Sequence, residues 1–582
     1  MDIAARVISV VGRTSTSDPS TASSSNPPKV GRVMDVSDGV FIGGFIPSLI
    51  EKQRYPYSRP EFLYFSEEEI ALSSDHSVRP VLCPRFPHRM PLYVGYAEAI
   101  NAGKTVQNED QASAKMLVLT QHQGNEMNGF SSDEKKSETR KRNSNENDDD
   151  PMLTPGGDDT VSYLNVVNEK SSMFAPRADG ALFSLFDGHA GSAVAVVASK
   201  CLHEHVKSRL CEVLDTILHM DRHENLNFGK HRSESSYSMS EMSREDENRI
   251  RSEHLVKGAL ETAFLDMDEQ IAQDKQVWRL PGGCAVISVL VFLGKLYIGG
   301  DFKNFFELSE GCHITIFPNS INVEKINNTR KLSNAGDCRA ILVTSDGSRA
   351  LSKDLTPASE RKRLQELAYR NPELIGNSFS RLEYSKRLTI HDLKSRVLYR
   401  DWFMDGWAVK TVKECDLRPS LISETSRKKR LLNTIGVSRG FGDHHLLTVD
   451  ERLSIKPFLS AVPEISVTNL RDMNTLTDKD VVIVASDGLW DVLSNEDAGL
   501  IVRSTLGSTD SADPSRYTQA AQDLVAAARG QQASGNLKRW VMNTGGHASY
   551  DDITVFVIPL KYCAAPPTNM EDEEDDEMLS LE

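Results

Sequence analysis

The stretch LFSLFDGHAGSAVA, residues 182–195, contains the transition that decides the fold. Its opening run of Leu and Phe is typical of a buried strand. The chain from Ala193 onward, AVAVVASKCLHEHVKSRL, has the apolar spacing of a helix. The polar triplet Asp187, Gly188 and His189 therefore lies where a strand is expected to pass into a helix.

On its residues alone, this triplet has two interpretations. Asp-Gly is a common turn dipeptide, because Gly accepts positive φ and Asp bonds its own backbone. The same pair at Asp346 and Gly347 separates two short apolar runs and predicts a hairpin turn. A functional role for Asp187 requires partners elsewhere in the chain.

Length and composition indicate a globular protein that carries polar insertions. The chain has 582 residues, of which 39% are hydrophobic and 26% charged, with a net charge of −16. This acidity argues against a nucleic-acid partner, which would bind a basic patch, and no apolar run reaches the length of a membrane span. The eight cysteines form no C-x-x-C pair, which disfavours zinc and redox motifs and indicates a reducing compartment. We expect a cytoplasmic protein, with the nucleus as a further location, and the oligomeric state is left open.

Polar stretches divide the chain into a domain and its additions. Residues 1–57 are Ser/Thr/Pro-rich in part and are predicted to be mostly disordered, and the acidic tail 563–582 likewise. Two stretches, about 121–159 and 221–249, are predicted to be surface insertions. The single domain is expected to span residues 58–562.

Within this domain, strands and helices alternate. Two long helices are predicted at about 193–218 and 254–272, and later helices after Ser494 and before Gly530. The runs CAVISVLVFLGKLYIG and RAILVTSDGSRALS each predict two strands joined by a turn. Strands in hairpins together with helices in two pairs suggest packed sheets flanked by helices.

Acidic residues stand at the edges of five separate predicted elements. They are Glu109 and Asp110, Asp187, Asp337, Asp487 and Asp551. Each alone is typical of a solvated turn, but together they make a hard-cation site plausible, since Mg²⁺ and Mn²⁺ prefer carboxylate, carbonyl and water oxygens. Two such ions, roughly 3.5–4 Å apart, can clamp a phosphoryl group and activate a water. Gly188 would let its carbonyl approach an ion closely, although spacing alone does not show that the acids converge.

Six motifs, in order, resemble those of the metal-dependent (type 2C, PPM) protein serine/threonine phosphatases. They are NEDQA, LFDGHAG, NAGDCRA, TIGVSRGFGD, VASDGLWDVLSNEDA and ASYDDITVFVIPL, and the likeness covers about residues 93–560. Four further stretches resemble the neurite-extension-related branch of that family: GYAEAINAGKTVQNEDQA, SSDHSVRP, LYRDWFMDGWAVKTV and IKPFLSAVPE. The resemblance implies an α+β fold, a four-layer α-β-β-α sandwich of two antiparallel sheets flanked by antiparallel helix pairs.

The resemblance also implies the chemistry. Phosphoserine and phosphothreonine in proteins would be hydrolysed by a water that bridges two Mn²⁺ or Mg²⁺ ions, with His189 as the general acid for the leaving oxygen. The implied metal contacts are Asp187 (both ions), Asp487 and Asp551 (one ion), Gly188, Glu109 and Asp110 (the other ion), and Asp337 (a third, looser ion). Two rival functions are a catalytically weak pseudophosphatase scaffold and a phosphoesterase of small molecules.

Two features bear on substrate binding. Much of the family has an Arg five residues before the Asp of NED, where this chain has Thr105. We expect the neighbouring Lys104 to contact the substrate phosphate, although Lys cannot bind two oxygens as a fork. Residues of about 364–430 correspond to the family's flap, a natural place for recognition of protein substrates, or else an ordinary solvated insertion. Phosphorylated proteins are the expected partners, and the branch resemblance adds phosphorylated Rab GTPases.

One segment fits none of these patterns. The 34 residues 300–333 separate GKLYIG from NAGDCRAILV, and 16 of them are Phe, Ile, Asn or Lys, which have AT-rich codons. We interpret the segment as intronic sequence read in frame, because long structureless loops are rare in compact domains. A genuine surface loop is the alternative, since loop-closure entropy rises slowly with length.

Overall fold

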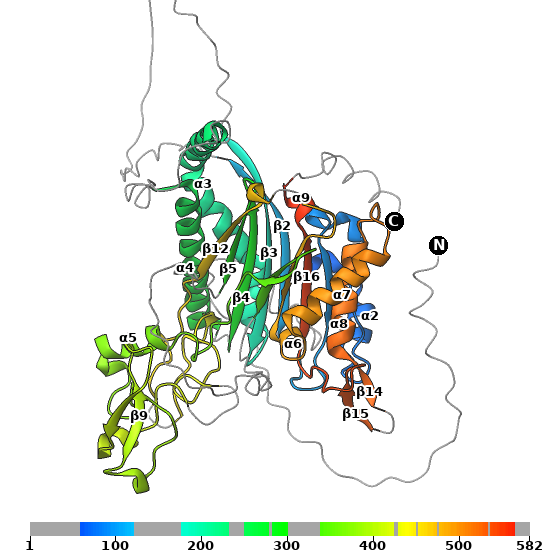
Figure 1. Ribbon diagram of the computed structural model, residues 1–582. Helices are drawn as coiled ribbons and strands as arrows, with labels where there is room; N and C mark the ends of the chain where they lie inside the picture. The colour runs from blue at the N-terminus through cyan, green and yellow to red at the C-terminus, as the bar shows by residue number, and fades with distance from the viewer. Residues whose placement is uncertain are drawn as a thin grey trace, which may run out of the picture. The chain divides into compact units, whose positions relative to one another are not determined.

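The computed structural model describes nine ranges of the chain: residues 59–120, 176–231, 250–278, 282–300, 338–423, 429–449, 452–473, 476–533 and 536–564. They form two antiparallel sheets that pack face to face, with helices on the outer face of each sheet (Figure 1). The predicted α+β four-layer sandwich is confirmed. None of the helices in these ranges is both long enough and apolar enough to span a membrane.

The first sheet has six strands, all paired antiparallel. In sheet order they are β12 (Glu464–Asn469), β5 (Lys295–Gly300), β4 (Gly283–Phe292), β3 (Arg177–His189) and β2 (Asp110–Thr120), with β11 (Phe441–Gly442) beside β4. The long helices α3 (Ala193–His231) and α4 (Ser252–Trp278) cover its outer face through a shared apolar core. This half of the sandwich carries the Asp-Gly-His triplet.

The second sheet has five strands, also antiparallel. In sheet order they are β1 (Gly95–Ala99), β16 (Ile553–Pro559), β13 (Val481–Ala485), β6 (Arg339–Thr344) and β7 (Gly347–Ala350). Its outer face packs on α7 (Asn495–Ser508) and α8 (Arg516–Arg529). The smaller elements of this part of the chain are α2 (Glu67–Ser73), α6 (Asp487–Trp490), α9 (Leu560–Ala564) and the hairpin β14 (Gln531–Ala533) with β15 (Asn536–Val541).

Strand β3 shows how the two sheets share one core. Phe183 and Leu185 point into the layer between the sheets, where they meet Phe556 of β16. Their neighbours Leu182 and Phe186 point the other way, into the layer under α3 and α4. This alternation follows from the period of two in a strand, and burial on both faces explains the unbroken apolar run.

A separate unit, which we call the flap, has its own apolar core. It contains α5 (Arg361–Arg370) and the three-stranded sheet of β8 (Glu383–Tyr384), β9 (Arg396–Arg400) and β10 (Ala408–Thr411). Its core joins Leu364 to Leu431, Ile455 and Phe458. The flap therefore begins slightly before and extends well beyond the predicted 364–430, because apolar side chains from the following segment complete the core.

Several elements extend beyond their predicted bounds. Helix α3 continues to His231, eleven residues into the predicted insertion 221–249, since that stretch contains no proline. Helix α9 includes buried Cys563, so the ordered domain passes residue 562. The helices predicted after Ser494 and before Gly530 are confirmed, with a capping box at Ser494 and a φ of 66° at Gly530.

The other segments predicted as additions lie outside the described residues: 1–57, 121–159, most of 221–249 and the tail after Ala564. The segment 300–333 also lies outside them, except for Gly300 at the end of β5. The strands that flank it belong to different sheets, with β5 in the first and β6 in the second. The intronic interpretation remains a prediction.

Candidate active site

The Asp-Gly-His triplet forms the last three residues of β3 rather than the predicted turn. All three pair with β4, and Asp187 also lies opposite Asp110 of β2. The turn follows at Ala190 and Gly191, with φ of 56° and 120°. Two acids are thus placed side by side at one end of the first sheet by the strand register alone.

Gly188 permits a close approach of two chain segments. Its N–H donates to the carbonyl of Glu109 at 3.1 Å, and a Cβ added to it would lie 2.4 Å from that same oxygen. The Oε1 atom of Glu109 in turn accepts from the N–H of Gly191 at 2.7 Å. Burial raises the pKa of Glu109. The lack of a side chain at residue 188 therefore brings Glu109 against the end of β3.

Asp187 is the centre of the acidic group. Burial raises the pKa of its carboxyl well above the ordinary value, and the nearby carboxylates of Asp487, Asp110 and Asp551 raise it further. Its Oδ2 atom is buried and has no hydrogen-bond partner. The four acids come from β3, α6, β2 and the loop before β16, so the structure brings together residues that the sequence places hundreds of positions apart.

Asp110 and Asp552 lie deeper, between the sheets. Thr554 Oγ1 donates to Asp110 Oδ2 at 2.7 Å, while Asp552 accepts from the N–H groups of Asn101, at 2.7 Å, and Glu109, at 3.0 Å. Burial and then Asp552 raise the pKa of Asp110, and burial raises that of Asp552 to about 7. Asp552 was not predicted as a site residue, although the doublet Asp551-Asp552 before an apolar strand was a visible signal.

Lys104 is the cation that the described residues place at this acidic group. Its ammonium forms an ion pair with Asp551. Burial opposes its charge, but Asp551, Asp487 and Asp187 raise the pKa of Lys104 above its ordinary value. The predicted phosphate contact is therefore held at the site by a carboxylate, and its role toward phosphate stays a prediction.

His189 has a partner that the sequence did not reveal. Its Nε2 atom lies 2.7 Å from Oδ2 of Asp443, whose side chain is 4% exposed. The N–H of Asp443 donates to the carbonyl of Gly282 at 3.0 Å, and its φ is 56°. Asp443 closes the motif TIGVSRGFGD. The signal that could have identified Asp443 is its position after Gly440 and Gly442, in a motif to which no other role was assigned.

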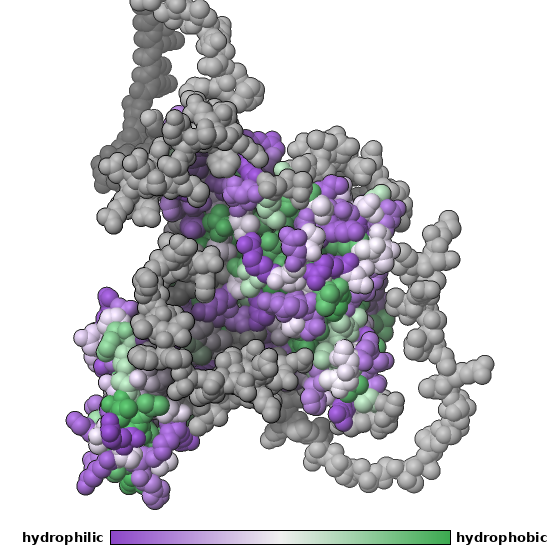
Figure 2. Space-filling view, in the orientation of Figure 1, coloured by the Kyte–Doolittle hydropathy of each residue, from purple (hydrophilic) through white to green (hydrophobic). Residues whose placement is uncertain are grey.

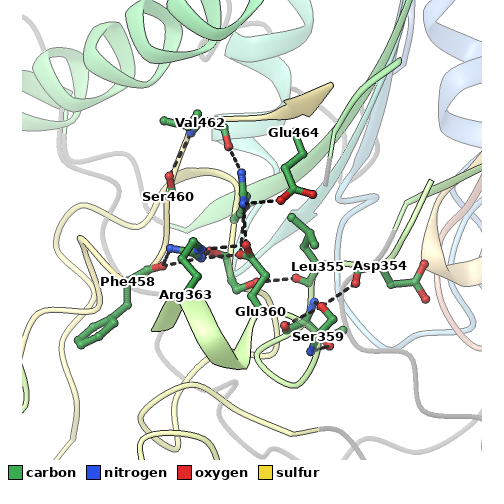
Figure 3. Close-up of polar contacts among 12 residues, drawn as sticks. Asp354, Leu355, Ser359, Glu360, Arg363, Phe458, Ser460, Val462 and Glu464 are labelled. Atoms are coloured by element: carbon green, nitrogen blue, oxygen red, sulfur yellow. Dashed lines mark hydrogen bonds and ion pairs between the residues drawn. The ribbon is translucent and has the colours of Figure 1, made fainter. Parts of the chain in front are cut away.

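A group of buried ion pairs joins the flap to the segment that carries Asp443. Arg439 donates to Glu360 Oε1 at 2.6 Å and to the carbonyl of Val462 at 2.7 Å. Arg363 pairs with the same carboxylate and donates to the carbonyl of Ser438 at 2.9 Å. Figure 3 shows Glu360 and Arg363 converging in this network. The base of the flap is thereby fixed five residues from Asp443.

The chemistry of the donor set fits divalent cations. In the described part of the chain, no three His, Cys, Asp or Glu side chains already form a ready metal centre. The group nevertheless offers several carboxylates and the unpartnered, buried Oδ2 of Asp187, which Mg²⁺ or Mn²⁺ would satisfy. Asp337, predicted to hold a third ion, lies outside the described residues.

Comparison with known proteins agrees with this arrangement. The family described as "Protein phosphatase 2C" matches residues 419–537. This match covers only part of the chain, but the relatives described below, 36–37% identical over most of the chain, show that it belongs to the protein phosphatase 2C family and is a protein serine/threonine phosphatase. Members of this family depend on Mn²⁺ or Mg²⁺, and their substrates are phosphoproteins.

The relatives are similar to this chain over almost their whole length. "Protein phosphatase 1H" of Homo sapiens is 36% identical over 528 residues, which cover 87% of this chain and 91% of that protein. "Protein phosphatase 1H" of Danio rerio is 37% identical, covering 88% and 93%. "Protein phosphatase 1M" of Homo sapiens is 35% identical, covering 87% and 92%.

Proposed function

We propose that this phosphatase uses a dinuclear Mn²⁺ or Mg²⁺ centre built on Asp187. The observation that carries the proposal is the buried, unpartnered Oδ2 of Asp187 among the carboxylates of Asp110, Asp487 and Asp551. Asp187 would contact both ions. Asp487 and Asp551 would hold one of them, and the carbonyl of Gly188, with Glu109 and Asp110 through water, would hold the other. Asp337 would hold a third ion. When bound, the ions supply electrophilic charge to the phosphoryl group and lower the pKa of a water.

The proton for the leaving group comes, in this proposal, from His189. The bond from Nε2 to Asp443 fixes the orientation of the ring and leaves Nδ1 to donate. A Ser or Thr alkoxide is a poor leaving group unless it is protonated as the bond to phosphorus breaks. Asp443 is then a positioning residue, since it acts through His189 and not on the substrate.

Lys104 is proposed to bind a phosphoryl oxygen. Its ammonium lies among Asp551, Asp487 and Asp187, so positive charge is already directed at the place where the phosphate must bind. A single ammonium supplies charge rather than a two-pronged contact. We expect it to contribute to binding more than to the chemical step.

The flap is proposed to recognise the protein part of the substrate. Residues 361–430 contain 17 Lys and Arg against 9 Asp and Glu, although the whole chain has a net charge of −16. Large apolar side chains are exposed on it, among them Phe403, Trp407 and Val409, and Figure 2 shows hydrophobic surface over this unit at the lower left. Cationic and aromatic groups favour an acidic protein surface. The branch resemblance adds phosphorylated Rab GTPases as candidate substrates.

A cytoplasmic location, with the nucleus as a further one, is also proposed. It is supported by the buried thiols Cys211, Cys284 and Cys563, which are free. Imaging of the tagged full chain in cells tests this proposal, and accumulation in the secretory pathway contradicts it.

One comparison separates the proposed function from its rivals. Phosphate release should be measured from a phosphothreonine peptide and from small phosphate esters, each with Mn²⁺ and with a chelator. We expect Mn²⁺-dependent release with a strong preference for the phosphopeptide. Absence of release from every substrate favours a scaffold, and equal turnover of metabolites favours a small-molecule phosphoesterase.

A further inference from the structure

One fully buried cation has no part in the proposed chemistry. Arg79 lies in SSDHSVRP, one of the stretches that resemble a single branch of the family. Its side chain is 0% exposed, and burial lowers the pKa of its guanidinium to about 10. Burying a charged group is costly unless its N–H groups are hydrogen-bonded. The partners of the Arg79 guanidinium therefore indicate its role.

The guanidinium binds three backbone carbonyls. Its Nε donates to Ile100 at 2.6 Å, its Nη1 to Ser549 at 2.7 Å and its Nη2 to Asp551 at 2.8 Å. The ring of Trp540 lies 5.3 Å from the guanidinium carbon. Arg79 is thus bonded to two loops, the one after β1 and the one before β16.

These two loops carry the cation and one carboxylate of the candidate site. Lys104 follows Ile100 in the first loop, Asp551 belongs to the second, and the two side chains form an ion pair. The loops are also joined by the N–H of Ala102, which donates to the carbonyl of Tyr550 at 3.0 Å. Arg79 binds the backbone carbonyl of Asp551, the residue whose carboxylate is proposed to bind a metal ion.

The backbone of Arg79 is fixed as well. Its N–H donates to the carbonyl of Asp75 at 2.9 Å, and its own carbonyl accepts from Nη1 of Arg529 at 2.6 Å. Asp75 Oδ1 accepts from the N–H of Ser77 at 2.7 Å, which closes the turn before it. Hydrogen bonds therefore fix the turn that carries Arg79, and its guanidinium restrains the loop that carries Asp551.

We propose that Arg79 is a positioning residue for the metal site, which it serves by fixing the backbone of Asp551. The inference rests on the proposed dinuclear centre and extends it to the segment before β1. Lysine could not substitute fully, because one ammonium cannot reach three carbonyls that the planar guanidinium bonds in different directions. Loss of such an outer contact typically weakens metal binding about 10- to 100-fold.

Arg516 offers a matched control. It is also buried, at 2% exposure, and it also binds a backbone carbonyl, that of Leu506, and a carboxylate, that of Asp478. None of these partners belongs to the candidate metal site. Arg516→Met should therefore destabilise the fold, because it removes a buried arginine, but it should not change metal affinity.

The test is calorimetric titration of Mn²⁺ into the chelator-treated full-length wild type, Arg79→Met, Arg79→Lys and Arg516→Met, with folding checked by circular dichroism. We expect the Mn²⁺ dissociation constant to rise about 10- to 100-fold in Arg79→Met, to rise less in Arg79→Lys, and to stay within about twofold of wild type in Arg516→Met. If Arg79→Met does not fold, Arg79→Lys decides the question by the same criterion. A folded Arg79 variant that binds Mn²⁺ as tightly as the wild type overturns the inference alone, whereas a wild type that binds no Mn²⁺ overturns the dinuclear centre beneath it.

Discussion

Two groups of buried carboxylates in this molecule have opposite surroundings. Between the sheets, Asp187 and Asp110 lie close to other acids, and burial followed by those acids raises their pKa values. At the base of the flap, burial alone would raise the pKa of Glu360, but hydrogen bonds from Arg439 and Arg363 lower it to about 2. Burial would also raise the pKa of Glu383, but hydrogen bonds from Arg400 and Lys429 lower it.

This difference is the basis for our proposal that the acids of the flap serve the fold, whereas those around Asp187 bind metal ions. A buried acid that serves only the fold is expected to be neutralised by cations of the chain, as Glu360 is. Among the acids around Asp187, Asp551 forms an ion pair with Lys104, and one oxygen of Asp187 has no hydrogen-bond partner. Such a group destabilises the fold by itself, and divalent cations would offset that cost.

The largest effect is expected where an acid of the first group is neutralised. Asp187→Asn should lower turnover of a phosphothreonine peptide by about 10³-fold or more. It should also raise the stability of the chelator-treated chain by about 1 kcal/mol, or about 2 °C in Tm, because a buried, unpartnered charge is removed. Steady-state assays with saturating Mn²⁺ and thermal melts measure both effects.

Asp416→Asn is the matched control from the flap, since that acid is buried and bonded to Lys410 and Tyr384. It should lower stability and leave turnover of small esters nearly intact. Near wild-type activity in Asp187→Asn would remove the basis for distinguishing the two groups.

The next effect concerns His189. His189→Gln should slow hydrolysis of a phosphothreonine peptide by about 10²–10⁴-fold and that of para-nitrophenyl phosphate far less, because nitrophenolate leaves without a proton. Asp443→Asn should shift the same ratio in the same direction by about 10- to 100-fold, as partners that orient a functional group do. The ratio of kcat/KM on the two substrates is the measurement, and equal losses on both would indicate a structural role instead.

In the flap, Glu360→Gln should destabilise the unit by about 3–5 kcal/mol, since it removes the buried carboxylate that pairs with both Arg439 and Arg363. Hydrogen exchange over α5 measures this local loss. Glu366→Gln removes a similar pair from an exposed helix face, where Arg370 is 71% exposed, and should change stability by less than about 0.5 kcal/mol. A similar, small effect of both changes would mean that the base of the flap does not depend on Glu360.

The same contact predicts a dependence on pH. The pKa of Glu360 falls from an ordinary 4.5 to about 2 on folding. Its contribution to the stability of the flap is therefore complete above pH 4.5 and is lost as the pH falls from there toward 2. The shift corresponds to about 3 kcal/mol. Exchange protection of α5 should decline over this range in the wild type and much less in Glu360→Gln, and an identical decline in both would contradict the assignment.

The smallest effect is expected at Lys104. Lys104→Met should raise the KM for a phosphopeptide about fivefold, equivalent to about 1 kcal/mol, because the side chain is 55% exposed and water screens its charge. kcat should change little. Steady-state kinetics at saturating Mn²⁺ measure both constants, and a large loss of kcat at unchanged KM would place Lys104 in the chemical step.

Local patterns predicted sheets flanked by helices and acids at strand ends, whereas the four-layer arrangement and the grouping of these acids were implied by the family resemblance. The apolar run of β3 and the acids at the ends of β13 and before β16 are visible because strand ends and hard-cation ligands both have local signatures. The end of β3 was less visible, so the triplet 187–189 was expected in a turn, whereas the structure places it in the strand and the turn at Ala190 and Gly191.

The contacts that could not be predicted are those that only tertiary structure creates. Asp443 is 254 positions from His189, and Arg79 is 472 positions from Asp551, and neither has a periodicity or spacing that indicates its partner. The extent of the flap was missed for the same reason, since Leu364 packs with residues as distant as Phe458. A single sequence therefore does not show which residues pair over such distances, even where a residue such as Asp443 stands out in its motif.

The central claim is that the acids around Asp187 form a site for divalent cations, whereas the acids of the flap do not. The most direct test is electron paramagnetic resonance of free Mn²⁺ during titration of the chelator-treated full-length chain. We predict that wild type and Asp416→Asn each remove two Mn²⁺ ions per chain from solution, and that Asp187→Asn removes fewer and binds them more weakly. Unchanged Mn²⁺ binding by Asp187→Asn, or a loss of binding in Asp416→Asn of the same size, would contradict the account.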